Sequence, residues 1–259
     1  MKLTFLQRLQ RSKDHKRKNE YELKKFLIRD GKKHPVAIIC PGGGYASVCS
    51  FLEGRPYAKL LNKMGYAAIV VYYRVGEKAH FPAPQEDLAR AVQEAIDHAE
   101  EWNIDMKNYS VWGSSAGGHL AASFGTESLG YKRYGLPKPA AIILTYPVIT
   151  MGEKTHQGTR GNLLGKQADE ELIRMYSVER QVTQDYPPTY IWCGDADQTV
   201  DPDNSRMLES ALVDKGVRCQ KREFTGVGHA VGVGKGTAAF GWLAEAVAFW
   251  KECKNEKGN

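Results

Sequence analysis

A pentapeptide with the pattern G-x-S-x-G, Gly113-Ser114-Ser115-Ala116-Gly117, is the feature of this sequence that most directly indicates chemistry. It follows a short apolar run at residues 109–112 and precedes a stretch of small residues. A strand, a sharp turn and a helix are the setting in which this pattern exposes a nucleophilic serine, and the glycines remove Cβ atoms that would clash. The register makes Ser115 the candidate nucleophile; the alternative is a structural serine in a tight turn.

A serine hydroxyl is a weak nucleophile and needs a base, usually a histidine oriented by a carboxylate. In the fold that this turn indicates, the acid and then the histidine follow the serine along the chain. His229 lies in a glycine-rich loop after the strand-like run 217–224, whereas His156 lies in a polar stretch with no strand before it. We therefore favour His229 as the base and expect His119, one helical turn after the serine, to pack inside its helix.

Two carboxylates compete for the role of the acid, because both follow the apolar run at residues 189–193. Asp195 comes directly after Gly194, where an aspartate often closes a turn through its own backbone. Asp197 lies deeper in the loop and has room to turn back toward His229. We therefore favour Asp197.

Acyl transfer also needs hydrogen-bond donors for the oxyanion. Three consecutive glycines at residues 42–44 follow a buried-strand pattern at residues 36–40 and allow backbone N–H groups to converge. The usual partner donor is the amide of the residue after the nucleophile, here Ala116. A flexible loop is the alternative, and a phosphate-binding loop is not indicated because no Lys-Ser/Thr pair follows the glycines.

In this order, these pieces resemble the α/β-hydrolase superfamily, in the esterase and lipase branch that carries HGGG and GDSAGG motifs. Within that branch the chain is most similar to bacterial carbohydrate esterases of the acetyl-xylan-esterase-like type. The matching segments lie between about residue 35 and about residue 250 and comprise Pro41-Gly42-Gly43-Gly44-Tyr45, residues 81–87, residues 113–118, residues 146–149, the Gly194, Asp197 and Val200 spacing, and Gly228-His229.

The resemblance implies that the three catalytic residues are Ser115, Asp197 and His229. Its G-x-x-D-x-x-V spacing also supports Asp197 over Asp195. It assigns the oxyanion hole to the backbone amides of Gly43, Gly44 and Ala116. Two positions depart from the family pattern, since Pro41 replaces the histidine of HGGG and Ser114 replaces an acidic residue, but neither change affects the triad.

The activity that the resemblance implies is that of a serine carboxylesterase that hydrolyses short acyl esters through an acyl-enzyme, without a metal or an organic cofactor. The expected substrate is a small-molecule ester, with acetylated xylo-oligosaccharides as candidates. Two alternatives remain open: a small amidase or peptidase on the same scaffold, and a non-catalytic binding protein that has kept the fold.

The elements that must position these residues alternate between strand-like and helix-like segments. This alternation predicts a doubly wound, mostly parallel sheet. The resemblance implies an α/β-hydrolase fold, with a mostly parallel central sheet, helices on both faces and a small insertion after the sixth strand. Helices are expected over residues 55–63, 84–102, 170–176 and 235–251, and further strands over residues 66–73 and 140–144. Ligand sites of such sheets lie at the carboxyl ends of the strands, where all the catalytic candidates fall.

Residues 150–185 interrupt this alternation and are the expected insertion near the active site. Such a segment can overhang the site as a lid, but its lack of a strongly apolar face argues against a lid for long acyl chains. In the resembling esterases it lies near the substrate. The candidate substrate-binding residues are therefore His156, Arg160 and Asn162, with a surface loop as the alternative, and Tyr45 and Tyr146 at strand ends, with core packing as the alternative.

Composition is consistent with one globular domain, because 42% hydrophobic and 25% charged residues are ordinary for a globular protein. The resemblance implies that residues 1–259 form a single α/β-hydrolase domain. No apolar run approaches the roughly 20 residues needed to cross a bilayer, and the start lacks the apolar core of a signal peptide. We therefore expect a cytoplasmic protein with no membrane partner. The five cysteines are scattered without C-x-x-C spacing and indicate neither a metal site nor a disulfide framework.

The net charge of +6 is concentrated near the start of the chain, in a basic arm at residues 1–20 and the lysines that follow it. A nucleic-acid partner is not expected, because interleaved aromatic residues and a nucleic-acid-binding motif are missing. We interpret the arm as a solvated extension or as a contact between copies of the chain in a homo-oligomer.

Overall fold

The described part of the chain is built around one twisted sheet. The computed structural model describes residues 21–255, and the predicted basic arm at residues 1–20 lies outside them. Seven strands of this part pair in the order β1-β3-β2-β4-β5-β6-β7; β1 is antiparallel to β3, and every other neighbouring pair is parallel. The strands are β1 (Glu22–Phe26), β2 (His34–Cys40), β3 (Ala67–Tyr72), β4 (Ile104–Ser114), β5 (Ala141–Thr145), β6 (Thr189–Gly194) and β7 (Cys219–Phe224).

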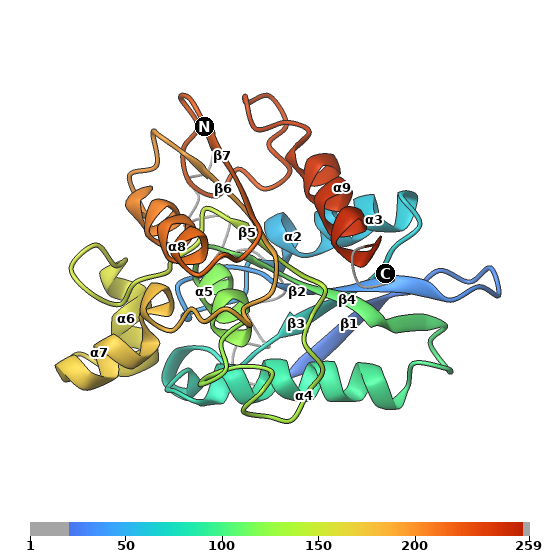
Figure 1. The fold of residues 1–259 in the computed structure, drawn as a ribbon, viewed down its shortest axis with the longest axis horizontal. Coiled ribbons are helices and arrows are strands. Elements are labelled where there is room, and N and C mark those ends of the chain that lie inside the picture. Colours follow the sequence, from blue (N-terminus) through green and yellow to red (C-terminus); the bar gives the residue numbers. More distant parts are fainter. Residues whose placement is uncertain (1–20, 256–259) are drawn as a thin grey trace, which may run out of the picture.

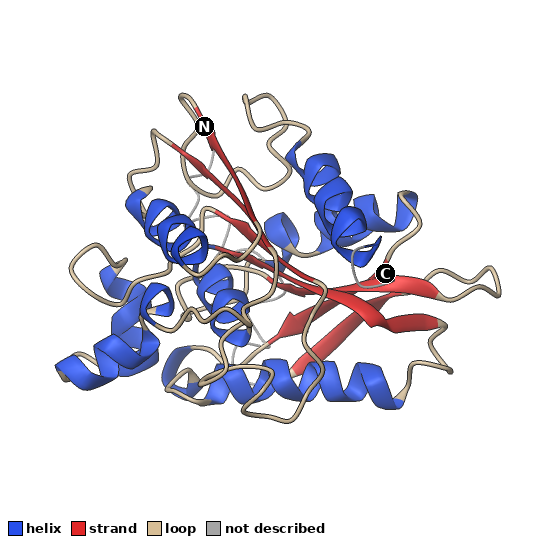
Figure 2. Cartoon of the chain, in the orientation of Figure 1, coloured by secondary structure: helices blue, strands red, loops and turns tan. Residues whose placement is uncertain are grey.

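Helices lie on both sides of this sheet, with α3 and α9 together on one side and α4 along the other (Figure 1; Figure 2). The predicted mostly parallel sheet with helices on both faces is therefore confirmed. The helices are α2 (Ser50–Glu53), α3 (Arg55–Lys63), α4 (Ala83–Asp97), α5 (Ser115–Phe124), α6 (Gln157–Leu164), α7 (Glu170–Tyr176), α8 (Asp203–Asp214) and α9 (Trp242–Asn255), with short 3₁₀ turns η2 (Gly76–Lys78) and η3 (Val178–Arg180).

Two separate cores form because successive side chains of a strand point to opposite faces. On one face of β3, Ile69 packs in a cluster that contains Leu88 of α4 and Leu120 of α5. On the other face, Val70 packs in a cluster that contains Trp242 of α9. Burial on both faces explains why the sequence of β3 is apolar throughout and does not alternate.

The first strand, β1, was not predicted, since its lysines read as part of the basic run. It is an edge strand, and charged residues are usual there because they discourage pairing with another chain. The ammonium of Lys24 lies 5.0 Å from the ring centre of Tyr72, and that of Lys25 lies 4.2 Å from the ring of Trp102. The lysine stems thus cover aromatic rings while the strand looks polar in sequence.

Several predicted boundaries need correction. Helix α4 ends at Asp97 rather than at residue 102, and α9 begins at Trp242 rather than at residue 235, because Gly236 and Gly241 adopt φ of +79° and +102°. The insertion at residues 150–185 contains α6, α7 and η3. It follows β5, which is the fifth described strand. The prediction placed the insertion after a sixth strand, but only one described strand, β1, precedes β2.

The carboxyl ends of the parallel strands meet at one edge of the sheet, and the predicted site residues follow those ends. The loop at residues 41–44 follows β2, Ser115 follows β4, Asp197 follows β6 and His229 follows β7. None of the helices formed by residues 21–255 has the length and apolar character needed to cross a bilayer. In the same part of the chain, His, Cys, Asp and Glu side chains form no cluster of three or more suited to a metal ion.

Candidate active site

Ser115 stands at a strained turn between β4 and α5. It begins α5 directly after Ser114 ends β4, and its φ of +53° lies in the left-handed region that non-glycine residues rarely adopt. Glycine at position 117 lets the start of α5 pack closely against the end of β2, because a Cβ atom on Gly117 would lie 2.1 Å from the carbonyl oxygen of Cys40. The predicted strand, turn and helix are confirmed, and they present Ser115 at the carboxyl edge of the sheet.

Three distant segments bring a carboxylate, an imidazole and this hydroxyl into line. The Nε2 atom of His229 lies 2.9 Å from Oγ of Ser115, and Nδ1 lies 2.6 Å from Oδ2 of Asp197. The other carboxylate oxygen of Asp197 accepts the N–H groups of Thr199 at 2.9 Å and Val200 at 3.0 Å. Because an ionised carboxylate can only accept, Nδ1–H donates to Asp197, and Nε2 is left to accept the serine proton.

The two competing carboxylates are placed differently. The side chain of Asp197 is only 1% exposed and faces His229. The exposed Asp195 instead accepts the N–H of Gly226 at 2.7 Å and closes the turn, as its position after Gly194 suggested. Of the two, the structure therefore brings only Asp197 to the histidine.

His119 lies away from the serine, in the core. The hydroxyl of Tyr45 donates to Nδ1 of His119 at 2.9 Å, and Nε2–H donates to the carbonyl of Tyr176 at 2.8 Å. Burial lowers the pKa of His119 to about 4, which keeps the ring neutral. The expectation that His119 packs internally is confirmed, whereas substrate contact by the fully buried Tyr45 ring is wrong.

The glycine loop packs directly on the candidate nucleophile. A Cβ atom on Gly42 would lie 2.8 Å from Cβ of Ser115, and one on Gly43 (φ +131°) would lie 2.1 Å from the carbonyl oxygen of Ser47. The loop is closed by the N–H of Ser47, which donates to the Gly43 carbonyl at 3.1 Å. Ala116 lies in the first turn of α5, where N–H groups have no acceptor within the helix.

The insertion reaches this loop through α6. The side-chain amide of Asn162 donates to the carbonyl of Gly44 at 2.8 Å, so the structure gives Asn162 a role in holding the loop. His156 caps α6, with Nδ1 2.8 Å from Oγ1 of Thr159, and its Cε1 atom lies 3.9 Å from where a Cβ of Gly44 would be. Its pKa is lowered by burial and then by the charge of His229. His156 therefore lies near His229, and of the two histidines only His229 reaches Ser115.

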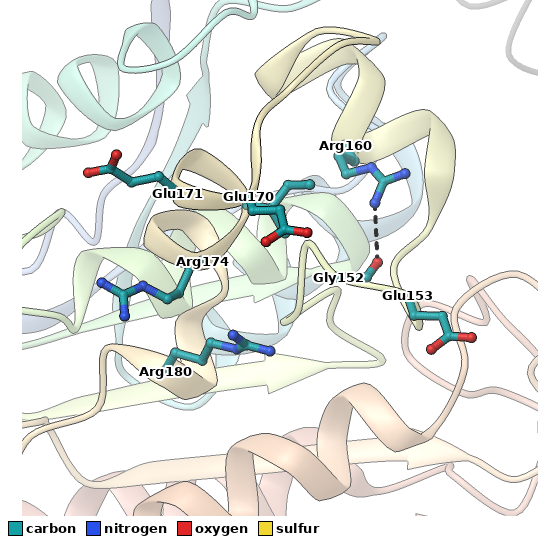
Figure 3. Close-up of a pocket in the computed structure, with 8 residues that line it drawn as sticks. Gly152, Glu153, Arg160, Glu170, Glu171, Arg174 and Arg180 are labelled. Atoms are coloured by element: carbon teal, nitrogen blue, oxygen red, sulfur yellow. Dashed lines mark hydrogen bonds between the residues drawn. The ribbon is translucent and has the colours of Figure 1, made fainter.

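Arg160 lies on the same helix and lines a separate cavity of about 580 Å³ (Figure 3). Its guanidinium donates to the carbonyls of Met151 at 3.1 Å and Gly152 at 3.4 Å. The cavity is lined by Gly152, Glu153, Arg160, Glu170, Glu171, Ile173, Arg174 and Arg180. A neighbouring cavity of about 620 Å³ shares Glu153 and reaches Asp197; it is lined by Glu153, Lys154, Thr155, Asp197, Gln198, Thr199, Asp201 and Pro202.

The ring of Tyr146 packs against the ring of His229. Its ring meets the His229 ring edge-on, with ring centres 4.8 Å apart and planes at 64°. The side chain is 1% exposed, so it is a buried support rather than an open pocket wall. Its hydroxyl donates at 2.9 Å to Oε1 of Glu53, whose Oε2 accepts the N–H of Gly42 at 2.6 Å.

Glu53 is the residue that the sequence did not reveal. It is 2% exposed, and burial raises its pKa, while the two hydrogen bonds and the charge of His229 oppose that rise. A lone glutamate at the end of a short helix ordinarily reads as a surface residue, because charged side chains are rarely buried. No spacing in the sequence relates it to the glycine loop or to Tyr146.

Comparison with known proteins identifies the family of this chain. The family model described as BD-FAE matches residues 27–212. The chain belongs to the BD-FAE family. It is 31% identical over 226 residues to endo-1,4-beta-xylanase B of Butyrivibrio fibrisolvens, and 33% identical over 232 residues to an acetylxylan esterase of Xylanibacter ruminicola. These matches cover 84% and 82% of this chain but only 35% and 47% of the relatives.

Solved structures agree with this assignment. An acetyl ester-xyloside bifunctional hydrolase from Caldicellulosiruptor lactoaceticus is 30% identical, with a TM-score of 0.81 over 90% of this chain and 88% of that one. An α/β-hydrolase enzyme from a deep-sea metagenome library, at 23% identity, shares the fold with a TM-score of 0.71 over 90% of this chain and 92% of that one. The α/β-hydrolase fold and the resemblance to carbohydrate esterases of this type are thus confirmed.

Proposed function

We propose that this BD-FAE family member is a serine carboxylesterase that removes short acyl groups, acetyl above all, from acylated sugars. The observation that carries the proposal is the continuous hydrogen-bonded line from Asp197 through His229 to Ser115, with distances of 2.6 Å and 2.9 Å. Such a line serves to activate a serine hydroxyl for attack on a carbonyl.

In the first half-reaction, His229 Nε2 removes the proton of Ser115 as Oγ attacks the ester carbonyl carbon. The imidazolium that forms is stabilised by the Asp197 carboxylate, which the N–H groups of Thr199 and Val200 hold in place. The tetrahedral intermediate collapses when the ester C–O bond breaks, and His229 gives the proton to the departing alcohol. An acyl group is then joined to Oγ of Ser115.

The second half-reaction repeats this chemistry with water. His229 removes a proton from the water that attacks the acyl carbon, and the Ser115 oxygen leaves with that proton, which releases the carboxylic acid. In both intermediates the negative oxygen would be bound by the amides of Gly43, Gly44 and Ala116. The close packing of the glycine loop on Ser115 supports this assignment.

A sugar alcohol is supported by the lining of the cavity beside Asp197. Seven of its eight lining residues have polar or charged side chains, which suit a hydroxyl-rich group better than a long alkyl chain. The names of the acetylxylan esterase from X. ruminicola and the acetyl ester-xyloside hydrolase from C. lactoaceticus support the same class. A short acyl group is supported by α6, which Asn162 and His156 bring against the glycine loop.

The test is a parallel measurement of kcat/KM on p-nitrophenyl acetate, butyrate and octanoate, on acetylated xylo-oligosaccharides and on an aryl acetamide. We expect acetate to be preferred over octanoate by at least about tenfold, which corresponds to about 1.4 kcal/mol, and acetylated xylo-oligosaccharides to release acetate. Efficient amide cleavage with negligible ester turnover would instead identify an amidase. Binding of the sugar without any turnover would identify a non-catalytic binding protein.

A further inference from the structure

Glu53 links the two halves of the candidate active site. It ends α2, and its carboxylate accepts the Gly42 N–H at 2.6 Å and the Tyr146 hydroxyl at 2.9 Å. Gly42 belongs to the glycine loop beside Ser115, and Tyr146 packs against His229. One side chain therefore holds both the loop assigned to the oxyanion and the ring that supports the base.

This carboxylate is costly to bury. Within residues 21–255 the structure shows no ion pair for Glu53, and an unpaired buried charge is unfavourable unless hydrogen bonds compensate it. Ionisable side chains that interact with it include Cys49, Tyr57, Tyr73, Tyr146 and His229. The hydrogen bonds from Gly42 and Tyr146 offset part of the cost of burial.

We propose that Glu53 is a positioning residue for the ester hydrolysis, which fixes the glycine loop through Gly42 and seats Tyr146 against His229. The proposal rests on the proposed function, because it assigns His229 as the base and the glycine loop to the oxyanion.

Glu53→Gln tests the paired acceptors at nearly constant shape. One amide oxygen still accepts a hydrogen bond, but the NH₂ group cannot accept, so either the Gly42 N–H loses its acceptor or the Tyr146 hydroxyl must turn and accept from the NH₂ group. We expect kcat on p-nitrophenyl acetate to fall about 10²-fold with KM changed less than about threefold, because the loop or the ring beside His229 is displaced.

Three further variants separate this role from simple structural support. Glu53→Asp keeps two carboxylate oxygens but shortens the side chain, so it cannot reach both the Gly42 N–H and the Tyr146 hydroxyl, and kcat should fall while KM changes little. Tyr146→Phe removes one of the two hydrogen bonds to Glu53, so kcat should fall about fivefold. Glu179→Gln is the matched control, because Glu179 is also a largely buried glutamate and lies beside Arg180, and its kcat should stay within about twofold.

The outcomes distinguish this proposal from the proposed function. An active wild type whose Glu53→Gln variant keeps its kcat, or whose KM rises as much as its kcat falls, overturns the role of Glu53 alone. A wild type that reacts with neither the ester nor a fluorophosphonate overturns both. If thermal melting shows that Glu53→Gln does not fold, Glu53→Asp and Tyr146→Phe decide, and wild-type kcat in both contradicts the proposal.

Discussion

Replacement of Asp197 by asparagine gives a sharp test, because the surroundings of this side chain determine how the amide must sit. Oδ1 accepts two main-chain N–H groups, from Thr199 and Val200. In the Asp197→Asn variant the amide oxygen should stay there, since the reverse orientation leaves the part-buried Thr199 N–H and the buried Val200 N–H without this acceptor, at about 1–3 kcal/mol for the buried donor. The amide NH₂ then faces Nδ1 of His229.

An NH₂ group at that place reverses the hydrogen bonding of the imidazole. Nδ1 becomes an acceptor, the proton moves to Nε2, and Nε2 can no longer accept the proton of Ser115. The same change of tautomer in a serine protease triad lowers kcat about 10⁴-fold, and we expect a loss of about 10³- to 10⁴-fold here, which is about 4–5 kcal/mol of transition-state stabilisation. KM should change little, because the Asp197 side chain is only 1% exposed.

The assay is steady-state hydrolysis of p-nitrophenyl acetate by Asp197→Asn and by a matched control, Asp195→Asn. Asp195 is exposed and accepts one N–H, from Gly226, which an amide oxygen can also accept. Its variant should retain kcat within about twofold. The reasoning is refuted if Asp197→Asn keeps more than about a tenth of wild-type kcat, or if the two variants lose activity equally.

Three other changes have definite expected outcomes. Gly43→Ala should lower kcat by about 10²-fold or more, because its Cβ would lie 2.1 Å from the Ser47 carbonyl oxygen. The added Cβ of Gly44→Ala meets nothing closer than 3.9 Å and should cost only about 1 kcal/mol of backbone strain. Equal losses of kcat in the two variants would contradict the packing described. Asn162→Ala should lower kcat about five- to tenfold by releasing the Gly44 carbonyl, while unchanged kinetics would show that α6 does not hold the loop. Urea unfolding should show the free energy of unfolding rising between pH 4 and pH 6.5, because His119 binds a proton in the unfolded chain but not in the folded one, where its pKa is lowered to about 4. His119→Gln should reduce that rise by about 3 kcal/mol. An equal rise in the variant would contradict the role of His119 in this pH dependence.

The parts of the site that depend on local chain geometry were predictable from sequence. Ser115 lies in a turn whose glycines are required sterically, and His229 and Asp197 lie in loops after strands whose carboxyl ends share one edge. Parallel strands with period-two or continuous apolar patterns are visible in sequence, so the edge at which their loops meet follows from the fold class.

The parts that depend on tertiary contacts were not predictable. Tyr45 reads as a pocket residue because it follows the glycines, but its left-handed backbone (φ +56°) accompanies a side chain buried against His119. Asn162 and Glu53 act through contacts with Gly44 and Gly42, 118 and 11 residues away along the chain. Only the folded structure relates such residues, because a hydrogen bond across elements leaves no periodic signal in sequence.

The most direct test of the catalytic assignment is to trap the acyl-enzyme and locate it. The protein is mixed with excess p-nitrophenyl acetate, quenched in acid within the first turnovers, digested and mapped by mass spectrometry, with Ser115→Ala and Ser114→Ala treated in parallel. We expect one acetyl group on Ser115 in the wild type and in Ser114→Ala, and none in Ser115→Ala. Acetylation of another residue at the rate of turnover, or an equal burst from Ser115→Ala, would contradict the assignment of Ser115 as the nucleophile.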